Sequence, residues 1–156
     1  MTQIRDLFDS TRALNRTIEK VITYQKRSAE QVRAEISEYI VTERIEENFS
    51  DLLKKMQLAA QEGGGHEIGV WVSGFYGSGK SSFTKYLGFA LDRSMKVGED
   101  TFLHLLQNQL QTAAVRALFN QVSATYDAAI IFLDLAGEML AGASMEDIST
   151  VLYLKV

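Results

Sequence analysis

The residues with the clearest chemical meaning lie at 74–81, which read Gly-Phe-Tyr-Gly-Ser-Gly-Lys-Ser. Their spacing is G-x-x-x-x-G-K-[ST], the pattern of a phosphate-binding P-loop. Gly74, Gly77 and Gly79 have no Cβ, so the backbone there can adopt positive φ and bring its N–H groups close to phosphate oxygens. The sequence therefore predicts a loop that binds a polyphosphate.

The side chains of this loop carry the rest of the predicted site. Lys80 supplies an ammonium for the β- and γ-phosphates, and it is the expected catalytic residue. The Ser81 hydroxyl is a hard oxygen of the kind that Mg²⁺ prefers. The predicted nucleotide-binding residues are Gly74, Tyr76, Gly77, Ser78, Gly79, Lys80, Ser81 and Ser82. The chain has no Asn-Lys-x-Asp sequence, the motif typical of GTP-specific proteins, so ATP is the expected nucleotide.

The segments on both sides of the loop predict the elements that position it. Residues 67–73 are apolar and β-prone, and apolar residues recur at helical spacing over 81–91. A strand, a glycine loop and a helix, in this order, form the context that a P-loop requires. The plainer alternative is a glycine-rich turn between a strand and a helix, in which Lys80 is solvated and nothing is bound.

Two helices are predicted before the loop. Ser28 and Gln31 form a capping box, which begins a helix that continues to about Tyr39. A second helix is predicted over 43–60, and the charged residues of both helices are expected to be solvated. The apolar face of the second helix consists of Ile45, Phe49, Leu52, Leu53 and Met56.

After the helix that follows the loop, the sequence predicts a turn at 95–100. A helix is predicted over 101–123, with a break near Gln111 and Thr112. Residues 128–135 form a nearly continuous apolar run that ends in Asp, which is typical of a strand covered on both faces in a parallel sheet.

Asp134, at the end of that apolar run, has two interpretations. It could be the Walker B carboxylate that holds Mg²⁺ through water, or it could cap the strand end or the turn that follows. Many ATPases place Glu directly after the Walker B Asp, whereas Leu135 follows here and Glu138 lies four residues on. These departures favour the capping interpretation, so Asp134 is a weaker candidate metal ligand than Ser81.

Composition narrows the class of protein. The chain has 156 residues and no cysteine, which excludes a disulfide framework. Its net charge of −4 argues against an extended surface for binding nucleic acid. His66 and His104 are far apart in sequence and are expected to be surface or packing residues. Neither a signal peptide nor a membrane span is predicted, so the expected location is the cytoplasm.

The expected fold class is α/β, with a P-loop NTPase core of the AAA+ type preceded by a helical N-terminal region. Residues 1–62 are assigned to the helical region and residues 63–156 to the P-loop domain, and the glycine-rich stretch 61–66 connects them. Such a domain needs a mostly parallel sheet with helices on both faces, and only two of its strands are predicted. The chain is therefore expected to carry the N-terminal part of an incomplete core and to expose apolar surface.

Several stretches resemble one family closely. They are residues 69–88, Gly-Val-Trp-Val-Ser-Gly-Phe-Tyr-Gly-Ser-Gly-Lys-Ser-Ser-Phe-Thr-Lys-Tyr-Leu-Gly, together with 4–8, 34–42 and 138–146. The sequence resembles the large P-loop proteins of bacterial BREX phage-defence systems (the BrxC/PglY family). The resemblance implies an AAA+-like ATPase that works with other BREX components, with the ATP site at residues 74–82.

Three functions are compatible with these observations. In the first, the chain is part of an ATPase of a defence complex, forms an oligomer, and has its hydrolytic residues beyond Val156, so that this segment alone is inactive. In the second, it is a nucleotide-gated scaffold with little or no hydrolysis. A small-molecule kinase is the third and weakest, because no acceptor site is visible. DNA contact would come through the complex, and no membrane contact is expected.

Overall fold

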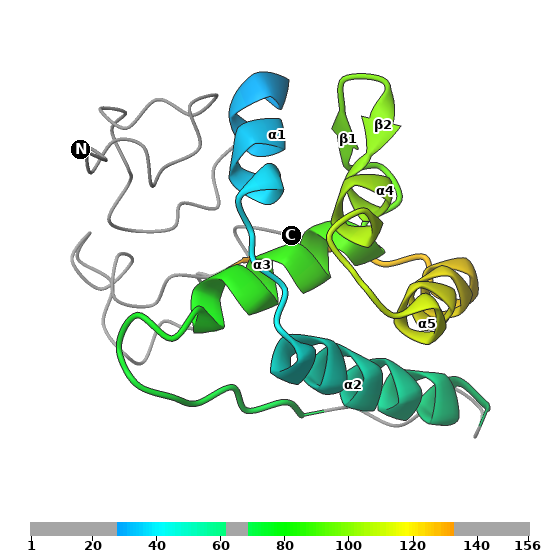
Figure 1. Ribbon diagram of the computed structural model, residues 1–156. Coiled ribbons are helices and arrows are strands. Elements are labelled where there is room, and N and C mark those ends of the chain that lie inside the picture. The colour runs from blue at the N-terminus through cyan, green and yellow to red at the C-terminus, as the bar shows by residue number, and fades with distance from the viewer. Residues whose placement is uncertain (1–27, 62–68, 133–156) are drawn as a thin grey trace, which may run out of the picture.

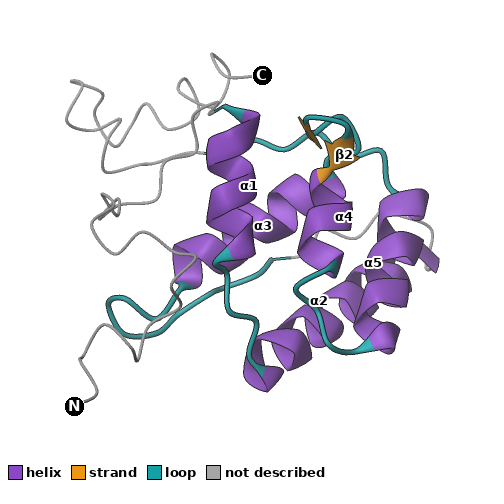
Figure 2. Ribbon diagram, turned by 45° about the horizontal axis from the view of Figure 1, so that its top comes forward, coloured by secondary structure: helices purple, strands orange, loops and turns teal. Residues whose placement is uncertain are grey.

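The structure, a computed structural model, describes residues 28–61 and 69–132. Within these ranges the regular elements are α1 (Ala29–Ser37), α2 (Glu43–Gln61), α3 (Lys80–Leu91), β1 (Lys96–Val97), β2 (Asp100–Thr101), α4 (Phe102–Gln107) and α5 (Ala113–Thr125). Figure 1 shows α3 running through the middle of this arrangement, with the other helices around it. Coloured by secondary structure, Figure 2 shows that the regular structure of the described part is mostly helical, with loops between the helices and one small pair of strands.

The two N-terminal helices form where their local signals predict them. The Ser28 side chain accepts from the Gln31 N–H at 3.3 Å, and the Gln31 side chain accepts from the Ser28 N–H at 3.1 Å, which confirms the capping box of α1. The helix ends at Ser37, two residues before the predicted end. On α2, Phe49 and Leu53 are fully buried, so the predicted apolar face is confirmed.

The turn predicted at 95–100 is a hairpin, in which β1 pairs antiparallel with β2. Gly98 has a φ of 68°, and the non-glycine residue beside it in the two-residue loop, Glu99, does not have positive φ. A two-residue loop with positive φ at its first position alone is a type II′ turn, which suits a tight hairpin. The predicted break in the helix over 101–123 is also confirmed, since α4 ends at Gln107 and α5 begins at Ala113.

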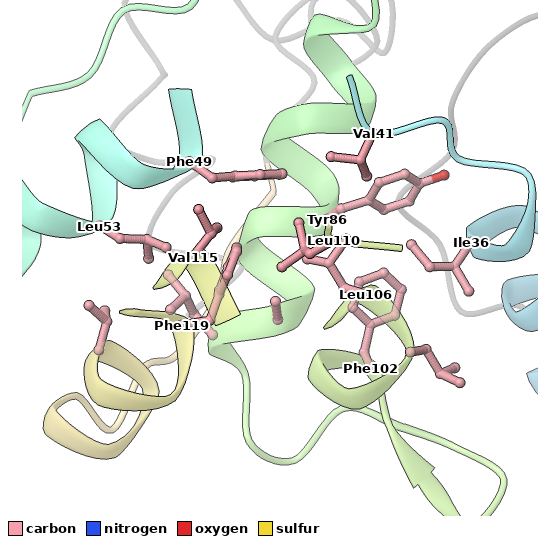
Figure 3. Close-up of a cluster of buried hydrophobic side chains, with 14 of the residues drawn as sticks. Ile36, Val41, Phe49, Leu53, Tyr86, Phe102, Leu106, Leu110, Val115 and Phe119 are labelled. Atoms are coloured by element: carbon pink, nitrogen blue, oxygen red, sulfur yellow. The ribbon is translucent and has the colours of Figure 1, made fainter. Parts of the chain in front are cut away.

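One hydrophobic core joins helices from both sides of the P-loop (Figure 3). Phe49 of α2 stacks on Phe83 of α3, with ring centroids 4.5 Å apart, and meets Phe119 of α5 edge-on at 5.3 Å. Tyr86 of α3 packs near Phe102 of α4, at 5.7 Å. The rings of α3 thus pack against α2 through Phe83 and against α4 through Tyr86. The other helices therefore hold α3 in place from two sides.

The expectation that charged residues of the N-terminal helices are solvated is wrong at two positions. Glu35 of α1 accepts from Lys85 Nζ at 2.7 Å and from the Tyr86 hydroxyl at 3.0 Å, and the Lys85 side chain is only 2% exposed. Glu46 of α2 is buried and caps the N-terminus of α5 by accepting from the backbone N–H and hydroxyl of Thr112. The hydrogen-bond partners of both carboxylates lie far away in the sequence, so no short sequence window contains the reason that they are shielded from solvent.

A third long-range contact fixes the hairpin to α1. The guanidinium of Arg33 donates to the Val97 carbonyl at 3.0 Å and to the Asp100 carboxylate at 2.8 Å. The hydrogen bonds from Arg33 and from the His104 ring hold the pKa of Asp100 below its ordinary value. The His104 side chain is itself largely exposed, in line with the predicted surface position.

The two predicted strands are not strands over their described parts, which are residues 69–73 and 128–132. A strand is defined by backbone hydrogen bonds to a neighbour, and within the described residues neither segment makes such a ladder. The apolar side chains of 128–132 instead pack on a helix, since Ile130 and Phe132 lie against Gly88 of α3.

Among the described helices, none is both long enough and apolar enough to cross a bilayer.

Candidate functional site

The loop 74–81 lies at the N-terminal end of α3, as Figures 1 and 2 both show, and its backbone has the predicted glycine conformations. Gly77 and Gly79 have φ values of 78° and 83°, in the left-handed region that favours glycine. A Cβ on Gly74 would come within 2.9 Å of Ser78 Oγ, so a side chain there would require the Ser78 hydroxyl to turn away. The Ser78 N–H donates to the Phe75 carbonyl at 3.2 Å, which closes the turn.

The first turn of α3 leaves a row of donors open. Gly79 is the N-cap and has no side chain to cap the helix. The first backbone bond of the helix runs from the Phe83 N–H to the Gly79 carbonyl at 2.9 Å. Among the described residues, no acceptor is found for the N–H groups of Lys80, Ser81 and Ser82. These groups, with the positive end of the helix dipole, are suited to an anion.

Lys80 folds back over the loop. Its Nζ donates to the carbonyls of Gly74 at 2.9 Å and Phe75 at 2.7 Å, and it lies 3.5 Å from Ser78 Oγ. Held in this way, the ammonium lies at the start of the same loop that ends at these N–H groups. The structure therefore brings the predicted residues of the loop together around one end of α3.

A magnesium ion fits the donors present, although the site supplies few of them. Within the described residues, the Ser81 hydroxyl forms no hydrogen bond, so its oxygen is available to a metal that keeps most of its waters. Thr84, one turn on, is already used, because its hydroxyl donates to the carbonyls of Lys80 and Ser81. No group of three or more His, Cys, Asp or Glu side chains in the described ranges could hold a metal by itself. Asp134, the other predicted ligand, lies outside the described residues.

A cleft of about 620 Å³ opens beside the loop, between α2 and residues 69–75. Its walls include Gly74, Gly79 and Lys80 of the loop and, across from them, Asn48 and Asp51 of α2. This volume lies in the range of small-molecule sites, which is about 300–1,000 Å³.

The stacking of Phe83 on Phe49 holds α2 against the first turn of α3, and Phe83 also lines the cleft.

Three aromatic side chains in and just before the loop are exposed to solvent. Trp71 and Phe75 line the cleft and are each 91% exposed, and Tyr76 is 98% exposed. Tyr39, on the opposite side, is largely buried, and burial raises its pKa to about 12, so that it stays protonated at neutral pH. The cleft thus combines the residues of the glycine loop at one end with exposed rings beside them.

The polar wall of the cleft was not predicted from sequence. Asn48, Asp51 and Lys55 belong to the helix whose charged residues were expected only to be solvated. Their spacing of three and four residues places them on one side of α2, which is the only signal available in the sequence. Nothing in the sequence shows that this side meets the P-loop, because the contact depends on core packing.

No family model matches the chain, and no solved structure matches it.

Proposed function

We propose that this protein binds ATP·Mg²⁺ at the loop 74–81 and is an ATPase subunit of a bacterial phage-defence complex of the BREX type. The observation that carries the nucleotide part is the loop itself. Two left-handed glycines lead into a helix whose first N–H groups find no acceptor among the described residues, and the ammonium of Lys80 is held on the carbonyls of Gly74 and Phe75 in the same loop. The resemblance of residues 69–88 to the BrxC/PglY proteins supports the defence role.

In this proposal the loop binds and orients the triphosphate. The N–H groups of Lys80 to Ser82 and the Lys80 ammonium would hold the phosphate oxygens, and Ser81 would be the protein ligand of Mg²⁺. The metal would neutralise charge on the phosphates during their transfer. The fold that we propose around the loop is a P-loop NTPase core of the AAA+ type, working in the cytoplasm as an oligomer with other BREX components.

The test is Lys80→Ala, with ATP affinity measured by calorimetry in the presence of Mg²⁺. Loss of a charge-assisted contact worth roughly 3 kcal/mol should weaken binding by about 100-fold. Lys54→Ala is the matched control, because Lys54 is exposed on α2 and does not line the cleft. Circular dichroism of both variants checks that the helices are retained. Equal ATP affinity for the two variants would contradict the proposal.

A second candidate, a nucleotide-gated scaffold with little hydrolysis, is favoured by one feature of the sequence. Leu135 follows Asp134 where many ATPases carry a Glu that activates water. Phosphate release by the complete protein separates the candidates. A scaffold should assemble when ATP is added without releasing phosphate, whereas an ATPase should release it in a manner that depends on Lys80.

A further inference from the structure

The cleft beside the P-loop is larger than its phosphate-binding end requires. Its phosphate-binding groups are confined to the loop and the first turn of α3, while the rest of its roughly 620 Å³ lies between α2 and the segment before the loop. A triphosphate at the open N–H groups would leave that remaining part unfilled. The question is therefore what chemical group the remaining walls would fit.

We propose that the adenosine half of ATP occupies this remaining part, with its base against Trp71 and its polar edge toward Asn48 and Asp51. The inference rests on the proposed function, because it takes the triphosphate to be held by the P-loop. It adds a base-binding subsite built by α2, a helix that contains no recognisable nucleotide motif.

The aromatic wall is the first argument. Trp71 is 91% exposed and lines the cleft three residues before Gly74, so a large ring stands in solvent beside the phosphate site. Stacking of a base on such a ring contributes about 1–3 kcal/mol. Phe75 and Phe83 line the same cleft, so Trp71 is one of several aromatic side chains in its walls. A flat heteroaromatic base is an occupant that suits these walls.

The polar wall is the second argument. Asn48 and Asp51 are three residues apart on α2, and both line the cleft opposite the loop. An Asn amide offers an acceptor and a donor side by side, which matches the N6 amine and the adjacent ring nitrogen of adenine. The Asp51 carboxylate can accept from the same amine. Lys55 lies one turn further along α2 and offsets the Asp51 charge, so the wall is polar without being strongly anionic.

The position of α2 is the third argument. The ring of Phe49 is 0% exposed and stacks on Phe83 with an interplanar angle of 16°. This contact fixes α2 to the first turn of the same helix that carries Lys80. Asn48, next to Phe49 in the chain, is therefore held at a set place relative to the phosphate site. A subsite that is already formed avoids much of the entropic cost of ordering its groups around a ligand.

The chain provides its own probe, because Trp71 is its single tryptophan. The experiment titrates the 156-residue chain with ATP and, separately, with inorganic tripolyphosphate, each with Mg²⁺, while Trp71 emission and the heat of binding are followed. We expect both ligands to bind in a manner that depends on Lys80. ATP should bind at least 10-fold more tightly, and only ATP should change the Trp71 emission.

A pair of α2 variants tests the polar wall. Asn48→Ala should weaken ATP binding by about 10-fold, the loss of one good bidentate base contact, and leave tripolyphosphate binding unchanged. Glu47→Gln is the matched control, because Glu47 is exposed on the same helix and does not line the cleft. It should leave both affinities unchanged.

The outcomes separate this inference from the proposed function. If tripolyphosphate and ATP bind equally well, or if ATP binds without changing Trp71 emission, the base lies elsewhere; the inference then fails while the phosphate site stands. An Asn48→Ala variant with unchanged ATP affinity also overturns the inference. If neither ligand binds, the proposed function fails, and the inference fails with it. Concentration-dependent association through Trp71, with no response to ATP, would assign the exposed rings to a second copy of the chain and overturn the inference.

Discussion

At the scale of single residues, Glu46 shows how much one carboxylate can do away from the proposed nucleotide site. Burial pushes the pKa of Glu46 upward, but hydrogen bonds from Thr112 and Gln111, with the positive charge of Arg116, outweigh it and hold that pKa below its ordinary value of 4.5. The carboxylate satisfies N–H groups at the start of α5, a helix whose N-cap Thr112 makes no side-chain cap of its own. It therefore holds the N-cap residue Thr112, and with it the start of α5, from a distant helix.

Glu46→Ala should lower the free energy of unfolding by about 2–3 kcal/mol at pH 7, because partly buried hydrogen bonds from Gln111 and Thr112 lose their charged acceptor. Since the pKa is lower in the folded state, the contribution of Glu46 is present above 4.5, and it is lost as the pH falls through the folded value. Urea denaturation at pH 7 and at about pH 3 should therefore show a smaller difference between wild type and variant at the acid pH.

Glu47→Ala is the control for this measurement, because Glu47 lies next in the chain and is exposed. Its ion pair with Arg44, at 3.6 Å, is solvated, and such a pair contributes less than about 1 kcal/mol. A loss for Glu46→Ala no larger than that for Glu47→Ala would show that the cap does not stabilise α5.

At the scale of elements, the packing of residues 130–132 on α3 depends on one glycine. A Cβ on Gly88 would come within 2.7 Å of Phe132 Cζ and 3.0 Å of Ile130 Cγ2. The Phe132 ring also meets Phe89 edge-on at 5.5 Å, which restricts its freedom to move away. The absence of a side chain at Gly88 therefore lets this segment approach the P-loop helix.

Gly88→Ala tests that contact by a double-mutant cycle. In an ordinary helix interior, Gly→Ala stabilises by about 1 kcal/mol, but here the methyl group should overpack the contact and destabilise the fold by about 1–3 kcal/mol. In a Phe132→Ala background, much of the clash is removed, so the same substitution should be neutral or stabilising. Unfolding free energies of the four proteins give the coupling. Additive effects would mean that Phe132 does not lie on Gly88.

At the scale of the whole molecule, α1 is joined to the P-loop helix by a buried ion pair. Lys85 Nζ contacts both oxygens of Glu35, at 2.7 and 3.0 Å, and lies 5.6 Å from the centre of the Phe89 ring. The Glu35 side chain is 21% exposed, whereas Lys85 is 2% exposed, so the cation depends on the carboxylate far more than the reverse. This asymmetry determines which partner can be removed at lower cost.

Glu35→Ala should destabilise the fold by about 3–5 kcal/mol, because it leaves a buried ammonium without its counter-charge. Lys85→Met should cost less, since the apolar stem is kept and the remaining carboxylate is partly solvated. Glu30→Ala, at an exposed position of α1, should change stability by less than about 1 kcal/mol. Thermal denaturation of the three variants gives the order, and a Lys85→Met variant less stable than Glu35→Ala would contradict this account.

The sequence by itself determined the features whose physics is local. The glycine conformations at Gly77 and Gly79, the capping box at Ser28, and the break between α4 and α5 each depend on a few consecutive residues. A missing Cβ, a side chain within reach of its own helix, and apolar residues at helical spacing act over one turn, so a short window of sequence contains the cause. The backbone conformation of the loop 74–81 belongs to this class.

Only the tertiary structure decided the features that need a distant partner. The apolar runs at 69–73 and 128–132 were predicted as strands, but apolar character does not distinguish a segment paired in a sheet from one packed on a helix, as 128–132 is at Gly88. The same reason explains the burial of Glu46 and the partial burial of Glu35, whose partners lie tens of residues away. The cleft walled by α2 is also of this kind, because its two sides meet only when Phe49 packs on Phe83.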